Sequence, residues 1–132
     1  MGEVQLAAIL CAMLGGEAEV RHTYTIAEGA REIRVDCETG TDVIEVGLDA
    51  KRSSFDSVVQ AMVAASLTGK RPMIVIIDTN GVEEGEEWQV ETAARASGIA
   101  YRTYTKAELI RWQMTAPFRD RAAANAPIGT GS

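Results

Sequence analysis

Hydrophobic and polar residues alternate in two neighbouring segments of the chain, residues 33–38 and 43–48. Such alternation is typical of strands that bury one face. The intervening Gly40-Thr41 suits a two-residue turn of the type that has glycine first. Together these features predict a β-hairpin.

The predicted hairpin places two acids opposite each other. Asp36 faces Glu45 and, one step along the same side, Arg34 faces Gly47. The other side pairs apolar residues only: Cys37 with Ile44, Val35 with Val46 and Ile33 with Leu48. Because like charges on opposed residues repel, the two acids need compensation. A divalent cation bound through oxygen ligands would provide it, or Arg34 would neutralise the pair as an ordinary surface ion network.

The remaining segments predict four helices and three more strands. Helical periodicity occurs in residues 3–14, 53–68, 82–97 and 105–116, and strand patterns occupy residues 19–27, 72–78 and 99–104. In the second helix we expect a buried stripe formed by Phe55, Val58, Val59, Met62, Val63 and Leu67. A right-handed crossover should make strand 72–78 parallel to the strand that carries Glu45. The order αβββαβαβα predicts an α/β fold, a three-layer α/β/α sandwich around a mixed five-stranded sheet.

Length and composition predict a single domain over residues 1–121, followed by a flexible tail over residues 122–132 that is rich in small residues. The longest apolar run, residues 6–14, is too short to span a bilayer, so we expect no membrane partner. Cys11 and Cys37 lie on apolar faces of a helix and a strand. This placement predicts two reduced core thiols in a cytoplasmic protein.

The net charge of -6 argues against tight nucleic-acid binding, because that affinity comes chiefly from lysine and arginine side chains. Any contact with DNA should be local, and targeting to DNA should come from a partner protein. The single histidine, His22, is assigned no role. A small-molecule-binding α/β domain has no support from a glycine-rich phosphate loop, because no strand is followed by one.

The order of elements, with acids on the second and third strands and a glutamine in the following helix, resembles the PD-(D/E)XK nuclease superfamily, which has the restriction-endonuclease-like fold. Asp36 matches the motif aspartate, and residues 45–47 match its E-x-K segment. Glu3 matches the glutamate of the first helix, and Gln60 matches the helix glutamine. The resemblance covers nearly the whole chain in topology. It implies that Asp36, Glu45 and the Val46 carbonyl bind Mg²⁺ or Mn²⁺, which activates water and stabilises charge on a DNA phosphate.

The chain departs from the family pattern at Gly47, which stands where the motif has lysine. Lys51 could swing back from the strand end, or Lys70 could approach from the end of the second helix. The hairpin register adds Arg34, whose guanidinium stays protonated and could stabilise phosphate charge without accepting a proton. A site without activity is the fourth possibility.

Two functions follow from this resemblance. The first is a magnesium-dependent DNA nuclease, or a catalytically degenerate relative, in which Glu3 and Gln60 assist the two acids. The second is a non-catalytic module for protein contacts or homo-oligomerisation, such as a homodimer, with Trp112 and Phe118 as an apolar contact surface. Asp78 ends a buried strand and could be a ligand in another α/β arrangement, because strand ends face ligand crevices. The acids near residue 87 suit a helix N-terminus and need no functional account.

Overall fold

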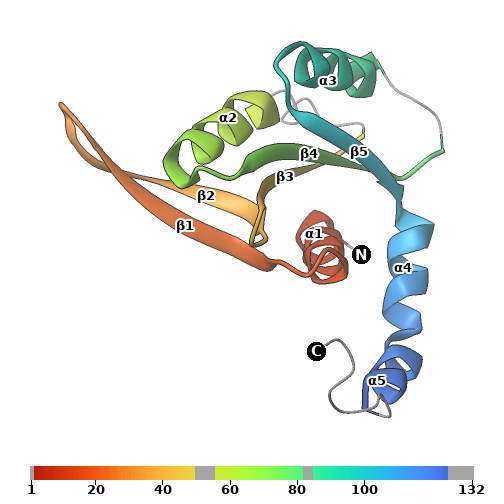
Figure 1. Ribbon diagram of the computed structural model, residues 1–132. Helices are drawn as coiled ribbons and strands as arrows, with labels where there is room; N and C mark the ends of the chain where they lie inside the picture. Colours follow the sequence, from red (N-terminus) through yellow and green to blue (C-terminus); the bar gives the residue numbers. More distant parts are fainter. Residues whose placement is uncertain (1, 50–55, 82–84, 125–132) are drawn as a thin grey trace.

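The computed structural model describes residues 2–49, 56–81 and 85–124, with side chains through residue 122. The elements are α1 (Glu3–Met13), β1 (Glu17–Ile26), β2 (Gly29–Glu38), β3 (Asp42–Leu48), α2 (Ser57–Thr68), β4 (Arg71–Asp78), α3 (Gly85–Ala96), β5 (Ala100–Thr105), α4 (Lys106–Met114) and α5 (Ala116–Ala124) (Figure 1). The order of elements predicted from the sequence is confirmed as far as α4. Residues 53–55, with which the predicted second helix begins, lie outside the described residues.

One mixed sheet contains all five described strands, in the order β1-β2-β3-β4-β5. Strands β1, β2 and β3 pair antiparallel, whereas β3, β4 and β5 pair parallel. The predicted parallel pairing is confirmed, because Glu45 of β3 lies beside Ile74 of β4. The predicted α/β class with a mixed five-stranded sheet is therefore correct.

The C-terminal segment contains one helix more than the sequence pattern predicts. α4 ends at Met114, and α5 begins at Ala116, so Pro117 lies in a first helical turn. Proline is tolerated there because its missing N–H would have no helical partner in any case. Residues 122–124 belong to α5, so the start of the predicted tail is helical. Within the described part of the chain, no helix is both long enough and apolar enough to cross a membrane.

Two groups of buried side chains fix the sheet between helices. Alternate residues of β3 and β4, including Ile44 and Val75, pack with Leu10 of α1 and Leu109 of α4. The other residues of β4, such as Ile74, pack with α2 and α3. Accordingly, α2 and α3 lie on one face of the sheet, and α1 lies on the other (Figure 1). β4 is buried on both faces, as its continuous apolar sequence predicts.

The predicted buried stripe of α2 is correct in part for Val58, which is partly buried against the core, but it is wrong for four other residues. The residues that α2 buries are Ser57, Ala61 and Ala64, whereas Val59, Met62, Val63 and Leu67 are 65%, 48%, 37% and 41% exposed. Phe55 lies outside the described residues. α2 contains no charged residue, so its sequence does not mark a polar face, and packing selects the side chains that face the sheet. The alanine methyl groups let the helix backbone lie close to the sheet.

The turn between β2 and β3 has the predicted length. Thr39 N–H donates to the Asp42 carbonyl at 2.9 Å across Gly40 and Thr41, and the first strand pairs are Glu38 with Val43 and Cys37 with Ile44. The expected glycine-first conformation is wrong, because neither turn residue has a left-handed φ. Instead, Thr39 Oγ1 accepts hydrogen bonds from the N–H groups of Thr41 and Asp42, at 3.2 and 2.9 Å. This side-chain acceptor stabilises a turn that needs no positive φ.

β2 leaves β3 directly after the Cys37–Ile44 pair. The predicted pairs of Val35 with Val46 and of Ile33 with Leu48 are therefore wrong. Val46 packs against α1, whereas Val35 packs with Val43 and with Ala64 of α2. β2 continues its pairing with β1 as far as the Ile26–Gly29 pair, and the resulting hairpin extends away from the rest of the sheet (Figure 1). The divergence opens the edge of β3 beside Asp36.

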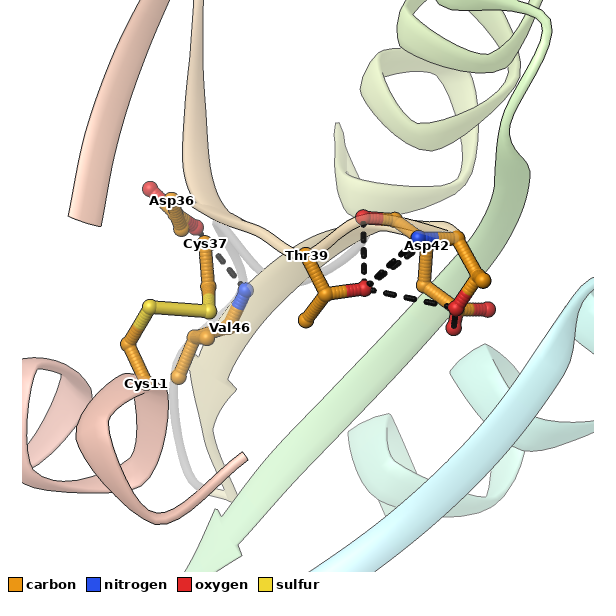
Figure 2. Close-up of a disulfide and its surroundings, with 7 residues drawn as sticks. Cys11, Asp36, Cys37, Thr39, Asp42 and Val46 are labelled. Atoms are coloured by element: carbon orange, nitrogen blue, oxygen red, sulfur yellow. Dashed lines mark hydrogen bonds between the residues drawn. A yellow bond between two sulfur atoms is a disulfide. The ribbon is translucent and has the colours of Figure 1, made fainter. Parts of the chain in front are cut away.

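Cys11 and Cys37 form a disulfide that joins α1 to β2 (Figure 2). Their predicted burial is confirmed, since both are at most 1% exposed, but the prediction of two reduced thiols is wrong. Both face the core between α1 and the sheet, and their Cα atoms are 5.5 Å apart, a separation suited to a disulfide. Because the two cysteines are paired, they no longer support the prediction of a cytoplasmic protein.

Candidate functional site

A pocket of about 400 Å³ lies where β2 leaves β3. It is lined by residues of α1, β1, β2, β3 and α2: Glu3, Val4, Ala7, Ala8, Ala18, Glu19, Arg34, Asp36, Val46, Gly47, Asp56, Ser57 and Gln60. Five residues selected from the sequence thus surround one pocket: Glu3, Arg34, Asp36, Val46 and Gln60. Glu45 contacts Asp36 through its side chain, and Lys51 lies outside the described residues.

Asp36 completes the hydrogen bonding of β3 at the point where the β2 backbone is no longer paired. Val46 N–H donates to Asp36 Oδ2 at 2.8 Å (Figure 2). The backbone N–H of a buried strand residue needs an acceptor, and here a carboxylate replaces the neighbouring strand. Because the N–H and C=O of a strand residue point the same way, the Val46 carbonyl also faces this edge. The carboxylate and the carbonyl therefore lie on the same edge of β3.

Glu45 is a buried acid held against a second acid. Its side chain hydrogen-bonds with the Asp36 carboxyl, and the residue is only 2% exposed. Burial, the nearby Asp36 charge and this hydrogen bond raise the pKa of Glu45 to about 9, although Arg34 opposes the rise. No donor among the described residues reaches Glu45 Oε1. The pair therefore retains a proton at neutral pH, and a bound cation would take the place of that proton.

Arg34 is the only cationic residue among the described residues that line the pocket. Its guanidinium lies 3.7 Å from the carboxylate of Glu19, in an ion pair whose side chains are about half exposed. Its charge also acts on Glu45. Arg34 and Gly47 line the same pocket, although they are not a strand pair. Among the three cations considered for the missing lysine, Arg34 is the one that the structure places here.

Glu19 was not selected from the sequence. It is the only described residue other than glycine with a positive φ, at 56°. The β1 residues on either side, Ala18 and Val20, pair with Cys37 and Val35, so Glu19 lies level with Asp36. A left-handed conformation is uncommon for glutamate and has no signature in this sequence. The result is a further carboxylate at the pocket.

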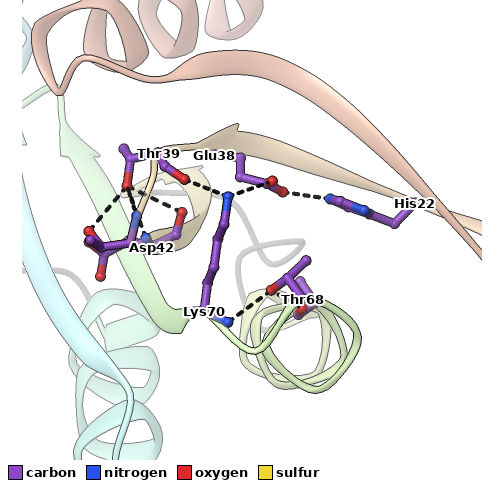
Figure 3. A network of polar contacts seen from close by, with 8 residues as sticks. His22, Glu38, Thr39, Asp42, Thr68 and Lys70 are labelled. Atoms are coloured by element: carbon purple, nitrogen blue, oxygen red, sulfur yellow. Dashed lines mark hydrogen bonds and ion pairs between the residues drawn. The ribbon is translucent and has the colours of Figure 1, made fainter.

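Lys70 binds elsewhere and does not line the pocket. Its Nζ donates to Glu38 Oε2 at 2.9 Å and to the Thr39 carbonyl at 2.7 Å (Figure 3). His22, to which the sequence assigned no role, contacts Glu38 Oε1 through Nε2 at 2.5 Å. Burial acts to raise the pKa of Glu38, but the hydrogen bonds from Lys70 and His22 outweigh it and lower the pKa. Lys70 therefore has a structural role: it connects the end of α2 with the β2–β3 turn.

Glu3 and Gln60 border the pocket from opposite helices. Glu3 lies in the first turn of α1, where its negative charge also interacts favourably with the helix dipole. Gln60 is an exposed residue of α2, and it also lines a shallower depression beside Arg21 and Glu32 of the β1–β2 hairpin. Both residues therefore have access to a molecule that enters the pocket.

A second group of acids lies directly after the carboxyl end of β3. Carboxylate oxygens of Asp49, Asp78 and Glu87 lie within 4.8 Å of one another. Asp49 accepts hydrogen bonds from Thr79 N–H and Oγ1, at 3.0 and 2.9 Å. Sequence reasoning selected Asp78, missed Asp49 and explained Glu87 by the helix N-terminus. Asp49 could have been selected from the sequence, because it directly follows a strand that is predicted to be parallel to the strand ending at Asp78.

Comparison of the chain with models of protein families, with curated proteins and with solved structures gave no match.

Proposed function

We propose that the chain hydrolyses DNA phosphodiester bonds with Mg²⁺ or Mn²⁺ held by Asp36 and Glu45, in the manner of the PD-(D/E)XK nucleases. The observation that carries the proposal is the contact between the buried Glu45 carboxyl and Asp36, beside a pocket. A buried carboxyl beside a second, partly buried one is costly in an ordinary core, where apolar residues of the same size would pack without charge repulsion. A cation removes that cost.

The donor set fits a hard divalent cation. Two carboxylates and the Val46 carbonyl are oxygen ligands, and Mg²⁺ prefers few protein oxygens together with water. Glu45 Oε1, which has no donor among the described residues, provides a buried acceptor for it. The bound ion would stabilise charge on the phosphate and lower the pKa of a water molecule.

The residues of the chain itself would bind and orient the substrate. Arg34 supplies a permanent positive charge at the pocket, which Gly47 also lines. Its ion pair with Glu19 must open for the guanidinium to bind a phosphate. The amide of Gln60 can donate to or accept from the substrate or a water molecule. Because its guanidinium stays protonated, Arg34 would position the phosphate and would not serve as the base.

DNA would approach along the β1–β2 hairpin, which extends from the body of the protein (Figure 1). The hairpin carries Arg21 and Arg31 with exposed side chains, although each is paired with a glutamate. The net charge of -6 limits intrinsic affinity, so we infer weak, salt-sensitive binding that a partner protein would strengthen.

The test is hydrolysis of plasmid and single-stranded DNA in the presence of Mg²⁺ or Mn²⁺. We expect the wild-type chain to cleave and Asp36→Asn to lose activity by a factor on the order of 100 or more. Glu91→Gln, which changes a partly buried acid of α3 that does not line the pocket, is the matched control and should keep full activity. Absence of cleavage by the wild type with either metal, or equal cleavage by Asp36→Asn, would refute the proposal. Metal binding without cleavage would identify a degenerate relative of the nucleases.

A further inference from the structure

The pocket at Asp36 adjoins a second hollow, and three residues line both of them: Arg34, Asp36 and Gln60. The second hollow is the shallower depression beside the β1–β2 hairpin, and Arg21, Glu32 and Ile33 complete its lining. The two hollows therefore meet at the Asp36 side chain, which also contacts Glu45. A linear molecule that occupies both hollows would have its middle at the candidate metal site.

The pocket suits an uncharged group of limited size. One wall consists of small, uncharged residues of α1: Val4, Ala7 and Ala8. Among the described residues, its charged lining consists of Arg34 and four acids, which are Glu3, Glu19, Asp36 and Asp56. A further anion deep in the pocket would therefore face more acids than bases. The volume of about 400 Å³ lies near the lower end of the range for small-molecule sites, so the pocket holds one nucleoside and excludes a duplex.

The depression, by contrast, contains two arginines that lie opposite each other. Arg21 of β1 is the strand partner of Arg34 of β2, and opposed like charges repel. Two glutamates now compensate them: Glu32 lies 3.4 Å from Arg21, and Glu19 lies 3.7 Å from Arg34. The side chains of both ion pairs are about half exposed or more, and ion pairs of this kind contribute little stability. A phosphate can replace the glutamates, because guanidinium groups bind its oxygens in pairs.

We propose that the two hollows accept an unpaired strand of DNA. One base lies in the pocket against α1, its phosphate lies at Asp36, and the next phosphate lies between Arg21 and Arg34. This inference deepens the proposed hydrolysis of DNA and rests on it for the identity of the ligand. A base of a duplex must leave its stack to enter a pocket, whereas a base of a single strand has no pairing to break. Single-stranded DNA is therefore the preferred substrate.

The test is the affinity of the full chain for a labelled oligothymidylate and for a closed DNA hairpin with the same number of phosphates. Fluorescence anisotropy measures both affinities at low salt with Ca²⁺, which oxygen ligands also bind. We expect the single strand to bind more tightly by a factor on the order of 10, because only the hairpin must unstack a base. Equal affinities, tighter binding of the hairpin, or no binding of either DNA would overturn the proposal.

Ala8→Leu tests the position of the base. Ala8 is an exposed residue of α1, so the fold should accept leucine there, and the larger side chain occupies part of the pocket. We expect affinity for the single strand to fall by a factor on the order of 10, the size of one lost base contact. Ala12→Leu is the matched control, because Ala12 is exposed one turn further along the same helix and lines neither hollow. Equal affinities of the two variants would overturn the placement of the base.

Arg21→Gln tests the position of the second phosphate. We expect it to weaken binding of the single strand by a factor on the order of 10, as for one lost hydrogen bond to a charged group. Arg31→Gln is the control, because Arg31 belongs to the same hairpin, pairs with Glu28 and lines neither hollow. Both variants change the net charge equally, so equal losses would show an effect of net charge alone and overturn the placement of this phosphate.

Binding in this test requires no hydrolysis, so the two proposals can fail separately. A chain that binds the single strand through Ala8 and Arg21 but cleaves no DNA would refute the proposed hydrolysis and support this inference. A chain that cleaves plasmid DNA but binds the hairpin as tightly as the single strand would keep the hydrolysis and overturn this inference.

Discussion

The backbone N–H of Val46 donates to Asp36 Oδ2 at 2.8 Å, at the place where β2 leaves β3. A side chain thus replaces a strand at the edge of β3, and the same carboxyl group contacts Glu45. Asp36 is therefore both part of the hydrogen bonding of the sheet and part of the candidate site. Substitution of Asp36 by asparagine keeps an oxygen acceptor for Val46 N–H, whereas substitution by alanine leaves that N–H without it.

The raised pKa of Glu45 predicts that stability falls as pH rises. Between pH 4.5, the pKa of an ordinary glutamate, and about 9, the folded chain holds a proton on Glu45 that the unfolded chain has lost. Raising the pH in this window therefore favours unfolding, by at most about 1.4 kcal/mol per pH unit from this group. In metal-free buffer, Glu45→Gln should show a flatter dependence, because glutamine keeps a neutral donor toward Asp36. Urea unfolding of both proteins at several pH values measures the difference, and parallel curves would contradict the assignment.

Reduction of the Cys11–Cys37 disulfide should destabilise the chain. The bond joins α1 to β2 across a sequence separation of 26, and loss of such a cross-link typically costs about 2–4 kcal/mol. Urea unfolding with and without dithiothreitol should show this loss in the wild type. The double variant Cys11→Ala/Cys37→Ala is the control and should not respond to the reductant. An unchanged unfolding midpoint for the wild type would show that the disulfide does not stabilise the fold.

Gly16 packs directly against this disulfide, and we expect Gly16→Ala to destabilise the protein by about 1–3 kcal/mol. A Cβ atom there would lie 2.7 Å from Cys37 Sγ and 2.9 Å from the Glu38 carbonyl oxygen, so strand β2 must shift. Gly40→Ala is the control, since nothing lies within 4 Å of its Cβ position and Gly40 has no left-handed φ. Thermal unfolding of both variants compares the two effects, and equal melting temperatures would contradict the predicted contact.

Much of the fold could be predicted because the residue patterns are local. Alternation and a short turn determine the first pairs of the β2–β3 hairpin, and the crossover rule gives the parallel pairing of β4. The divergence of β2 at Asp36 could not be predicted, because it depends on how the long β1–β2 hairpin twists away from the sheet. The predicted contact between Asp36 and Glu45 is still present, although the two residues are not a strand pair, because their side chains meet.

Other features depend on packing that a single sequence does not encode. An uncharged helix has no polar face to mark its orientation, so most of the stripe predicted for α2 was placed on the wrong face. The disulfide requires α1 to lie over the end of β2, which residue spacing does not show. The same limit applies to Glu19, whose position beside Asp36 depends on a left-handed φ that sequence patterns rarely reveal. The closeness of Asp49 and Asp78 follows from the predicted parallel pairing of β3 and β4, whereas the approach of Glu87 depends on how α3 packs.

The most direct test of the central claim is the melting temperature of the chain with and without millimolar Mg²⁺ or Mn²⁺, for the wild type and for Glu45→Gln. A ligand that binds only the folded state stabilises it. We therefore predict that the metal raises the melting temperature of the wild type, and more at pH 8 than at pH 6, because Glu45 must release its proton. Glu45→Gln should lose most of this rise. An unchanged wild-type melting temperature, or an equal rise in Glu45→Gln, would contradict a metal site at Asp36 and Glu45.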